Sequence, residues 1–298
     1  MRETPDSCEK WGSVLYCCQM KGVSAVGKPD IWRLLAGALA VLTAAALTVL
    51  AASGVRLHQE FGSLIYMPPL VANPYTDADF VPAENGLLTF LPGHALLGVD
   101  VSEFQENIDW TQVKAAGVEF VMIRVGFRGY GDSGVMRWDD QAQSHYEGAK
   151  AAGLKVGAYF FSQAITPEEA VEEAEFLLRA VGSWDVDLPL VFDWEYIGSY
   201  ARTADMDART LTDCSRAFCR VIRRAGYTPM VYFNLTQARD LLYLEELTDF
   251  DWWLARYANT MDFEYRVTMW QYTDKGSIPG IEGEVDLNFW FPQGEAVS

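Results

Sequence analysis

Short apolar runs alternate with segments of helical length from Leu96 onward, and this alternation restricts the fold more than any other feature of the chain. Apolar runs of about four to eight residues bounded by polar or glycine residues indicate buried strands, and longer segments with a period near 3.6 indicate helices. Strands that alternate with helices usually pair in parallel. The chain is therefore expected to have an α/β fold.

Eight strands and five helices are expected in this region. The strands are Leu97–Val101, Phe120–Gly126, Lys155–Phe161, Leu188–Glu195, Pro229–Phe233, Trp252–Tyr257, Val267–Tyr272 and Val285–Phe289; the helices are Ile108–Ala116, Asp139–Ala152, Pro167–Val181, Asp205–Ala225 and Thr236–Leu244. The last three strands are joined by polar segments without a helical period. This predicts an irregular TIM-like β/α barrel of about 200 residues, at the small end of its class.

The fourth expected strand ends in two carboxylates. Leu190, Val191 and Phe192 are typical of a buried strand, and Asp193 and Glu195 follow two residues apart. Residues at this spacing share one face of a strand, about 7 Å apart. Two acids at an apolar site repel each other and lose solvation, so one is expected to keep its proton near neutral pH, as general acid catalysis on a glycosidic bond requires. The structural alternative is a strand end that simply meets solvent.

Two more acids belong to the expected mouth of the barrel. Asp100 ends the first strand and Asp286 lies in the eighth, and the functional groups of such barrels gather at the C-terminal ends of strands. Capping of nearby loops is the alternative for both. Aromatic rings beside acids suit a sugar, although core packing is the alternative for each ring. The rings that end strands are Tyr159, Phe161, Tyr232, Trp270 and Tyr272.

Several segments, in order, resemble glycoside hydrolase family 25, the muramidase-type lysozymes. They are Gly98–Ser102, Phe120–Arg124, Ala151–Tyr159, Leu190–Glu195, Trp270–Tyr272 and Val285–Asn288. The resemblance extends from about Leu96 to Phe291. One departure is Phe160, where many members of the family carry His.

The resemblance implies hydrolysis of the β-1,4 bond between N-acetylmuramic acid and N-acetylglucosamine in peptidoglycan, without a cofactor. By position, Glu195 is the implied general acid, Asp193 assists through the 2-acetamido group of the substrate, and Asp100 completes the catalytic set. The implied substrate-binding residues are Asp286, Tyr159, Tyr232, Trp270 and Tyr272. The implied partner is the glycan strand of peptidoglycan.

Other functions remain compatible with the same acids. A barrel that binds wall glycan without cutting it is the first alternative, and a Mg²⁺ enzyme is the second, because carboxylates also bind hard cations. A structural membrane protein with an inert outer domain is the third. No metal site is expected, because the three histidines cluster neither with each other nor with cysteines. The net charge of −18 disfavours nucleic acid as a partner.

Residues 34–55 contain no charged side chain and are long enough to cross a bilayer. Lys21, Lys28 and Arg33 precede this stretch, so the positive-inside rule places the N-terminus in the cytoplasm and the barrel outside. A cleaved signal peptide is the alternative, although the preceding segment is long for one. We therefore expect a single-pass protein of a bacterial cell membrane, in contact with the lipid bilayer through this helix.

The expected divisions are a cytoplasmic segment 1–33, an anchor 34–55, an extracytoplasmic connector 56–95 and a catalytic barrel 96–298. The apolar residues of the connector predict that part of it packs on the barrel: Phe61, Leu64, Ile65, Tyr66, Leu70 and Val71. The acidic residues of the third helix are expected to form a solvated face: Glu168, Glu172, Glu173 and Glu175. Cys214 and Cys219 are expected to be ordinary helix residues, because their spacing does not bring them together.

Overall fold

A computed structural model of the chain describes residues 56–60, 63–83, 87–93 and 95–292. The expected cytoplasmic segment 1–33 and the anchor 34–55 lie outside these ranges. Within the ranges, no helix has both the length and the apolar character needed to cross a bilayer.

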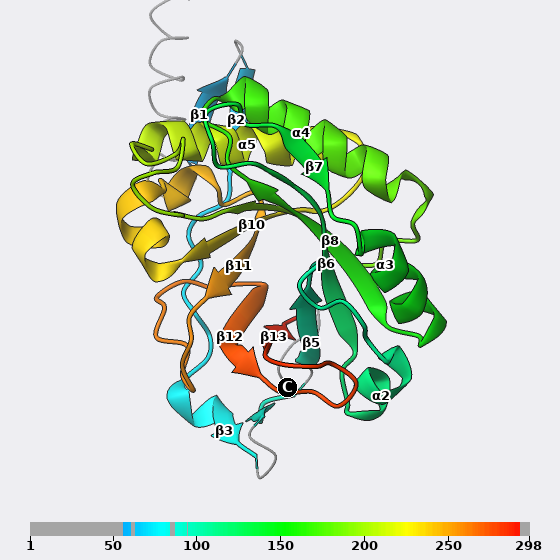
Figure 1. Ribbon diagram of the computed structural model, residues 1–298. Helices are drawn as coiled ribbons and strands as arrows, with labels where there is room; N and C mark the ends of the chain where they lie inside the picture. The colour runs from blue at the N-terminus through cyan, green and yellow to red at the C-terminus, as the bar shows by residue number, and fades with distance from the viewer. Residues whose placement is uncertain (1–55, 61–62, 84–86, 94, 293–298) are drawn as a thin grey trace, which may run out of the picture. The chain divides into compact units, whose positions relative to one another are not determined.

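Eight strands close into a barrel (Figure 1). They are β5 (Leu96–Val101), β6 (Phe120–Arg128), β8 (Lys155–Ser162), β9 (Leu190–Trp194), β10 (Pro229–Asn234), β11 (Asp251–Ala255), β12 (Met269–Gly276) and β13 (Val285–Trp290). Hydrogen bonds connect them in the order β5, β13, β12, β11, β10, β9, β8, β6, and pairing of β5 with β6 closes the ring. A short ninth strand, β7 (Met136–Trp138), pairs antiparallel with β6. All eight expected strands are present.

The last strand runs in the opposite direction to the other seven. β13 is antiparallel to both of its neighbours, β12 and β5. No helix separates β12 from β13 in this described part of the chain, so the chain reverses directly, as an antiparallel pair allows. Asp286 near the start of β13 is therefore paired with Asp100 near the end of β5. The reversal places both acids at the same end of the barrel.

Four of the five expected helices form: α2 (Trp110–Ala115), α3 (Ala142–Ala151), α4 (Pro167–Ala180) and α5 (Ala208–Arg224). The start of α4 is fixed by Thr166, whose Oγ1 accepts a hydrogen bond from the N–H of Glu169, and by Pro167 in the first turn. The fifth expected helix, Thr236–Leu244, is instead a π-helical turn over Gln237–Leu241 followed by a 3₁₀ turn over Leu244–Glu246.

One acidic residue of α4 is buried, which corrects the expectation of a solvated face. Glu173 is fully buried, and its carboxylate accepts hydrogen bonds from Arg128 Nε at 2.7 Å and from Ser162 Oγ at 2.5 Å. Burial raises the pKa of Glu173 to about 7, and the bonds from Ser162 and Arg128 oppose that rise. The sequence pattern of α4 could not predict that Glu173 is buried, because the arginine that pairs with it comes from β6.

Side chains along each strand alternate between the barrel interior and the outer layer. In β9, Val191 belongs to the interior cluster, whereas Phe192 packs against Phe218 of α5 with ring centroids 5.2 Å apart. Cys214 and Cys219 of α5 are free and buried, which confirms that they are ordinary helix residues.

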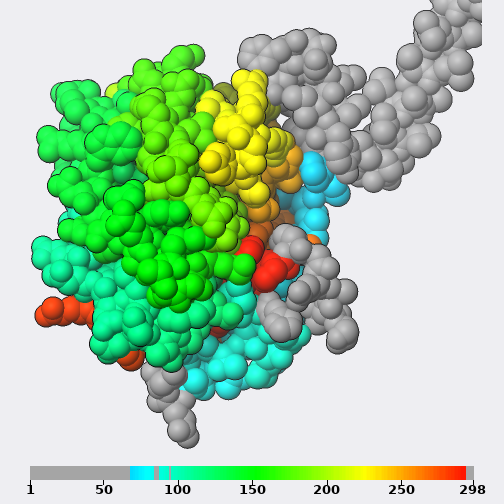
Figure 2. Space-filling model, turned by 90° about the vertical axis from the view of Figure 1, so that its right-hand side faces the viewer, coloured from blue at the N-terminus to red at the C-terminus, as the bar shows by residue number. Residues whose placement is uncertain are grey.

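Part of the connector packs on the outer side of β12 and β13 (Figure 1, cyan). The connector contains two hairpins, β1 (Arg56–Glu60) with β2 (Ser63–Met67) and β3 (Phe80–Pro82) with β4 (Leu88–Phe90), and the second of them belongs to the packed part. Phe80 is buried, with its ring centroid 4.8 Å from that of Trp270, and Ala72 forms a β-bridge with Tyr265. Figure 2 shows the cyan residues in close contact with the body of the barrel. The prediction that part of the connector packs on the barrel is confirmed for Leu70, but Val71 is exposed and the packing comes mainly from Tyr75, Phe80 and Phe90.

Candidate active site

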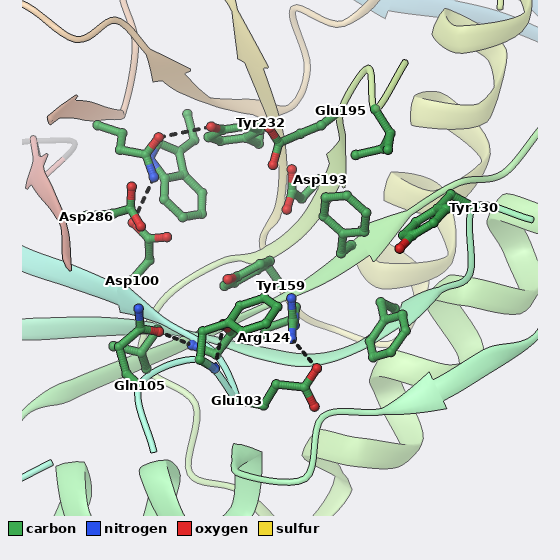
Figure 3. A pocket seen from close by; sticks show the side chains of 18 of the residues that line it. Asp100, Glu103, Gln105, Arg124, Tyr130, Tyr159, Asp193, Glu195, Tyr232 and Asp286 are labelled. Carbon is green, nitrogen blue, oxygen red and sulfur yellow. Dashed lines mark hydrogen bonds and ion pairs between the residues drawn. The ribbon is translucent and has the colours of Figure 1, made fainter. Parts of the chain in front are cut away.

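A cavity of about 460 Å³ opens at the end of the barrel where the parallel strands finish (Figure 3). Its volume is in the range of pockets that hold small ligands. Asp100, Asp193, Glu195 and Asp286 all line it. The structure thus brings together the four acids that the sequence placed at one mouth.

Asp193 and Glu195 come from the end of β9 and face the same cavity (Figure 3). Asp193 is buried, and its Oδ1 has no hydrogen-bond partner among the described residues. Burial first, and then the charge of Glu195, raise the pKa of Asp193 well above its usual range. Burial first, and then the charge of Asp100, raise the pKa of Glu195 to about 7. Both carboxyl groups therefore hold a proton to higher pH than a solvated carboxyl group does.

Asp100 is held by two side-chain amides. Its Oδ2 accepts hydrogen bonds from Asn288 Nδ2 at 2.7 Å and from Gln271 Nε2 at 2.9 Å. Burial raises the pKa of Asp100 to about 6, and these two bonds oppose the rise. Among the described residues no side-chain amide donates to Asp286, and burial, followed by the charge of Asp100, raises its pKa to about 8. Asp100 is therefore the more readily ionised member of this pair.

Two of the four predicted aromatic residues line the cavity, namely Tyr159 and Tyr232. The Tyr232 hydroxyl donates a hydrogen bond to Gln271 Oε1 at 2.9 Å, and both tyrosine rings meet Trp253 edge-on. Gln271 therefore connects Tyr232 to Asp100 and helps to fix the ring where it lines the cavity.

Trp270 and Tyr272 do not line the cavity, which corrects the sequence-based prediction for them. Alternation along β12 turns Gln271 inward and both rings outward. Trp270 is fully buried, and its Nε1 donates a hydrogen bond to the carbonyl of Arg256 at 2.8 Å. Tyr272 stacks on Phe289 with ring centroids 5.1 Å apart. Both rings belong to the layer beneath the connector.

Phe160 also points away from the cavity. It is fully buried and meets Phe176 of α4 edge-on, with ring centroids 5.4 Å apart. Its neighbour Phe161 lines the cavity. No substrate contact is therefore assigned to Phe160, the position at which this chain departs from many members of the family.

Other residues of the site were not predicted from the sequence. Arg124 of β6 donates to Asp139 at 2.8 Å and to Glu103 at 3.1 Å, and its guanidinium lies 5.1 Å from the centroid of the Phe104 ring. Gln271 and Asn288 hold Asp100. The sequence does contain one indication of these residues. A polar residue within an otherwise apolar strand is expected to be buried and to form hydrogen bonds there.

The cavity also has an aromatic border and offers no obvious metal site. Phe104, Tyr130 and Tyr257 line it and are about half or more exposed, so their ring faces can meet a ligand. Across the described part of the chain, no three His, Cys, Asp or Glu side chains are grouped so as to hold a metal ion. Carboxyl groups beside aromatic rings are suited to binding and cleaving a sugar chain.

An α/β barrel with a group of unpaired acids at its mouth is an arrangement suited to glycoside hydrolysis. The sequence profile described as "Glycosyl hydrolases family 25" matches residues 99–281, and the chain belongs to this family.

Two curated relatives carry lysozyme names. The chain is 28% identical over 192 residues to the autolytic lysozyme of Clostridium acetobutylicum, covering 64% of this chain and 54% of that protein. It is 27% identical over 204 residues to lysozyme M1 of Streptomyces globisporus, covering 64% of this chain and 66% of that protein. The chain thus spans about half the length of the first relative and about two thirds of the second.

Solved structures agree on the fold. The modular autolysin LytC of Streptococcus pneumoniae superposes with a TM-score of 0.60 at 24% identity, covering 80% of this chain and 57% of that chain. The bacterial lysozyme of Streptomyces coelicolor superposes with a TM-score of 0.55 at 24% identity, covering 68% and 94% respectively.

Proposed function

We propose that this protein is a muramidase that hydrolyses the β-1,4 bond between N-acetylmuramic acid and N-acetylglucosamine in peptidoglycan. The observation that carries the proposal is the convergence of Asp193 and Glu195, with Asp100 and Asp286, on one sugar-sized cavity. Family membership and the lysozyme names of both relatives support it.

The proposed chemistry assigns a role to each acid. Glu195 gives its proton to the glycosidic oxygen as the bond from that oxygen to the sugar C1 breaks. Asp193 stabilises the 2-acetamido group while the oxygen of that group bonds to C1. Water then opens the resulting ring: its oxygen bonds to C1 as the bond from C1 to the acetamido oxygen breaks, and one of its protons returns to Glu195. Asp100, fixed by Asn288 and Gln271, supplies negative charge near the developing positive charge at C1. Asp286 binds sugar hydroxyls.

The test is to incubate the full chain in detergent with purified peptidoglycan and to analyse the released fragments by mass spectrometry after borohydride reduction. A muramidase leaves N-acetylmuramic acid at the new reducing end. Fragments that end in reducing N-acetylglucosamine would refute the assignment. Wall that binds the protein but releases no fragment would favour the non-catalytic glycan-binding barrel.

We also propose that residues 34–55 anchor the chain in the bacterial cell membrane with the barrel outside, where it acts on the producer's own wall. The uncharged composition of this stretch and the lysines and arginine before it support the proposal. In spheroplasts, external protease should remove the barrel and spare a tag at the N-terminus. Protection of the barrel, or lysis of neighbouring cells by an intact producer, would count against it.

A further inference from the structure

Glu195 lies one residue beyond the end of β9, outside the hydrogen-bonded ladder. The last pairs of β9 join Trp194 to Ser162 of β8 and Asp193 to Tyr232 of β10. No hydrogen bond from a residue in the described ranges reaches the Glu195 carboxyl group. The direction in which this carboxyl group points therefore depends on how its main chain is held.

Two buried glutamines hold that main chain from both sides. Gln163 directly follows β8, and its Nε2 donates to the carbonyl of Glu195 at 3.1 Å. Gln237 lies just after β10, and its Nε2 donates to the carbonyl of Trp194 at 2.5 Å. A side-chain amide has the donor and acceptor of a peptide group, so these bonds continue the sheet beyond the last paired residues.

Each glutamine is itself fixed by hydrogen bonds. The Thr203 hydroxyl donates to Gln163 Oε1 at 2.7 Å, and Gln163 Nε2 also donates to the carbonyl of Ser162 at 2.8 Å. Asn234 and Gln237 exchange bonds, since each side-chain oxygen accepts from the other residue's main-chain N–H, at 2.7 and 3.0 Å. Both glutamines are almost completely buried. Buried amides with satisfied donors and acceptors form a rigid support.

We propose that Gln163 and Gln237 form an amide clamp that positions Glu195 for proton transfer to the substrate. The clamp rests on the proposed muramidase function. Neither glutamine lines the cavity, so both act through Glu195 and are positioning residues. Misplacement of a catalytic group by about 1 Å can cost about 100-fold in rate, which sets the size of effect expected when one bond is lost.

The test uses the full chain with Gln163→Leu or Gln237→Leu, changes that remove the donor and keep most of the volume. We expect kcat on peptidoglycan to fall about 10- to 100-fold with KM changed by no more than about twofold, because the clamp affects proton transfer and not binding. A loosened Glu195 meets more water, which lowers its pKa, so the alkaline limb of the pH profile should move to lower pH.

Asn73→Leu is the matched control. Asn73 Nδ2 also donates to two carbonyls, those of Phe263 at 3.0 Å and Met261 at 3.4 Å, but it belongs to the connector on the outer side of the barrel. This variant should lose stability and keep both kcat and the alkaline limb. A fall in kcat of the same size in Asn73→Leu as in the clamp variants would refute the clamp.

Thr203→Val keeps the proposal testable if a leucine variant does not fold. It leaves both glutamines in place and removes the hydroxyl that holds Gln163. We therefore expect kcat to fall about 3- to 10-fold and the alkaline limb of the pH profile to move to lower pH. If the clamp variants or Thr203→Val fold and keep both kcat and the alkaline limb of the pH profile unchanged, the clamp is refuted but the muramidase function is not. A wild-type chain that releases no muramic-acid fragments would refute the underlying function.

Discussion

Two groups of acids in this molecule differ in the partners that surround their carboxyl groups. The mouth acids are Asp100, Asp193, Glu195 and Asp286, and the helix acids, on α4, are Glu169, Glu172 and Glu173. The helix acids are paired with arginines: Arg128 lies 2.7 Å from Glu173 and 3.1 Å from Glu172, and Arg202 lies 2.7 Å from Glu169. Among the described residues, no arginine or lysine forms an ion pair with a mouth acid.

The difference separates structural acids from chemical ones. Burial raises the pKa of Glu173 and of Glu195 to about 7, but in the helix group Arg128 opposes the rise and occupies the carboxylate. At the mouth, the nearby acids add to the rise, and the protons remain available to a substrate. A raised pKa alone would not distinguish the helix acids from the mouth acids. The two groups are distinguished by whether an arginine pairs with the carboxyl group.

Glu195→Gln should give the largest difference between the groups. We expect kcat on peptidoglycan to fall about 1000-fold, because the amide has no acidic proton to give to the leaving oxygen. The matched control is Glu173→Gln, the same change at a fully buried glutamate outside the cavity, which should keep activity per folded molecule within about tenfold. Release of soluble fragments measures both. Full activity of folded Glu195→Gln would remove this residue from the role of general acid.

Arg128→Met tests the other side of the comparison. It leaves Glu173 buried without its cation, so we expect a loss of about 3 kcal/mol in the free energy of unfolding. The folded-state pKa of Glu173 is already raised, and without Arg128 it rises further. The loss should therefore be small below pH 4.5, where the carboxyl is neutral in both states, and should grow as the pH rises through about 7.

Urea unfolding of Arg128→Met at pH 4 and pH 8 makes the measurement. Arg209→Met is the control, because Arg209 also pairs with two acids, Asp213 and Glu246, but on the surface. It should cost less than about 1 kcal/mol. Equal losses in the two variants would show that the buried arginine contributes no more than an exposed one.

The pH dependence of activity is the third expected effect. The general acid must carry its proton, and the pKa of Glu195 is raised to about 7. We therefore expect kcat/KM on peptidoglycan to fall about tenfold per pH unit above about 7. Unfolding followed over the same range separates loss of the catalytic proton from loss of the fold. An alkaline limb near pH 4.5, the ordinary value for glutamate, would show that Glu195 is not shielded from water in solution.

Periodicity alone was enough to predict most of the fold. All eight barrel strands and four helices form near the expected positions, because strands with continuous apolar runs are buried on both faces and show a strong signal. The exception is the segment Thr236–Leu244, where Gln237 turns back to bond Trp194 and Asn234, so tertiary contacts override the helical pattern.

The site was harder to predict from the sequence than the fold. Asp100, Asp193 and Glu195 were found because they sit where strands end, and Asp286 because it lies in the eighth strand. Trp270 and Tyr272 were misplaced because a strand-end aromatic can face either side. Arg124 and the two clamp glutamines bond to residues far away in sequence, and no local pattern predicts such partners.

Asp193→Asn gives the smallest effect and the most direct test of the difference between the two groups. Asp193 is buried with an unpartnered oxygen, and its folded-state pKa lies well above its usual range, so its preference for the neutral form costs stability at pH values where the unfolded chain ionises. The amide removes that cost. At pH 8 we expect the free energy of unfolding to rise by about 1–2 kcal/mol, and at pH 3 to be unchanged.

The matched variant is Asp139→Asn, a buried aspartate that accepts hydrogen bonds from Arg124 Nε at 2.8 Å and from the N–H of Glu103 at 2.9 Å. The amide weakens these charge-assisted bonds, so this variant should lose about 1–3 kcal/mol at the same pH. If Asp193→Asn raises the free energy of unfolding and Asp139→Asn lowers it, the mouth keeps an ionisable group at the expense of stability. A loss of stability in both would mean that Asp193 has a partner in solution and belongs with the paired acids of the molecule.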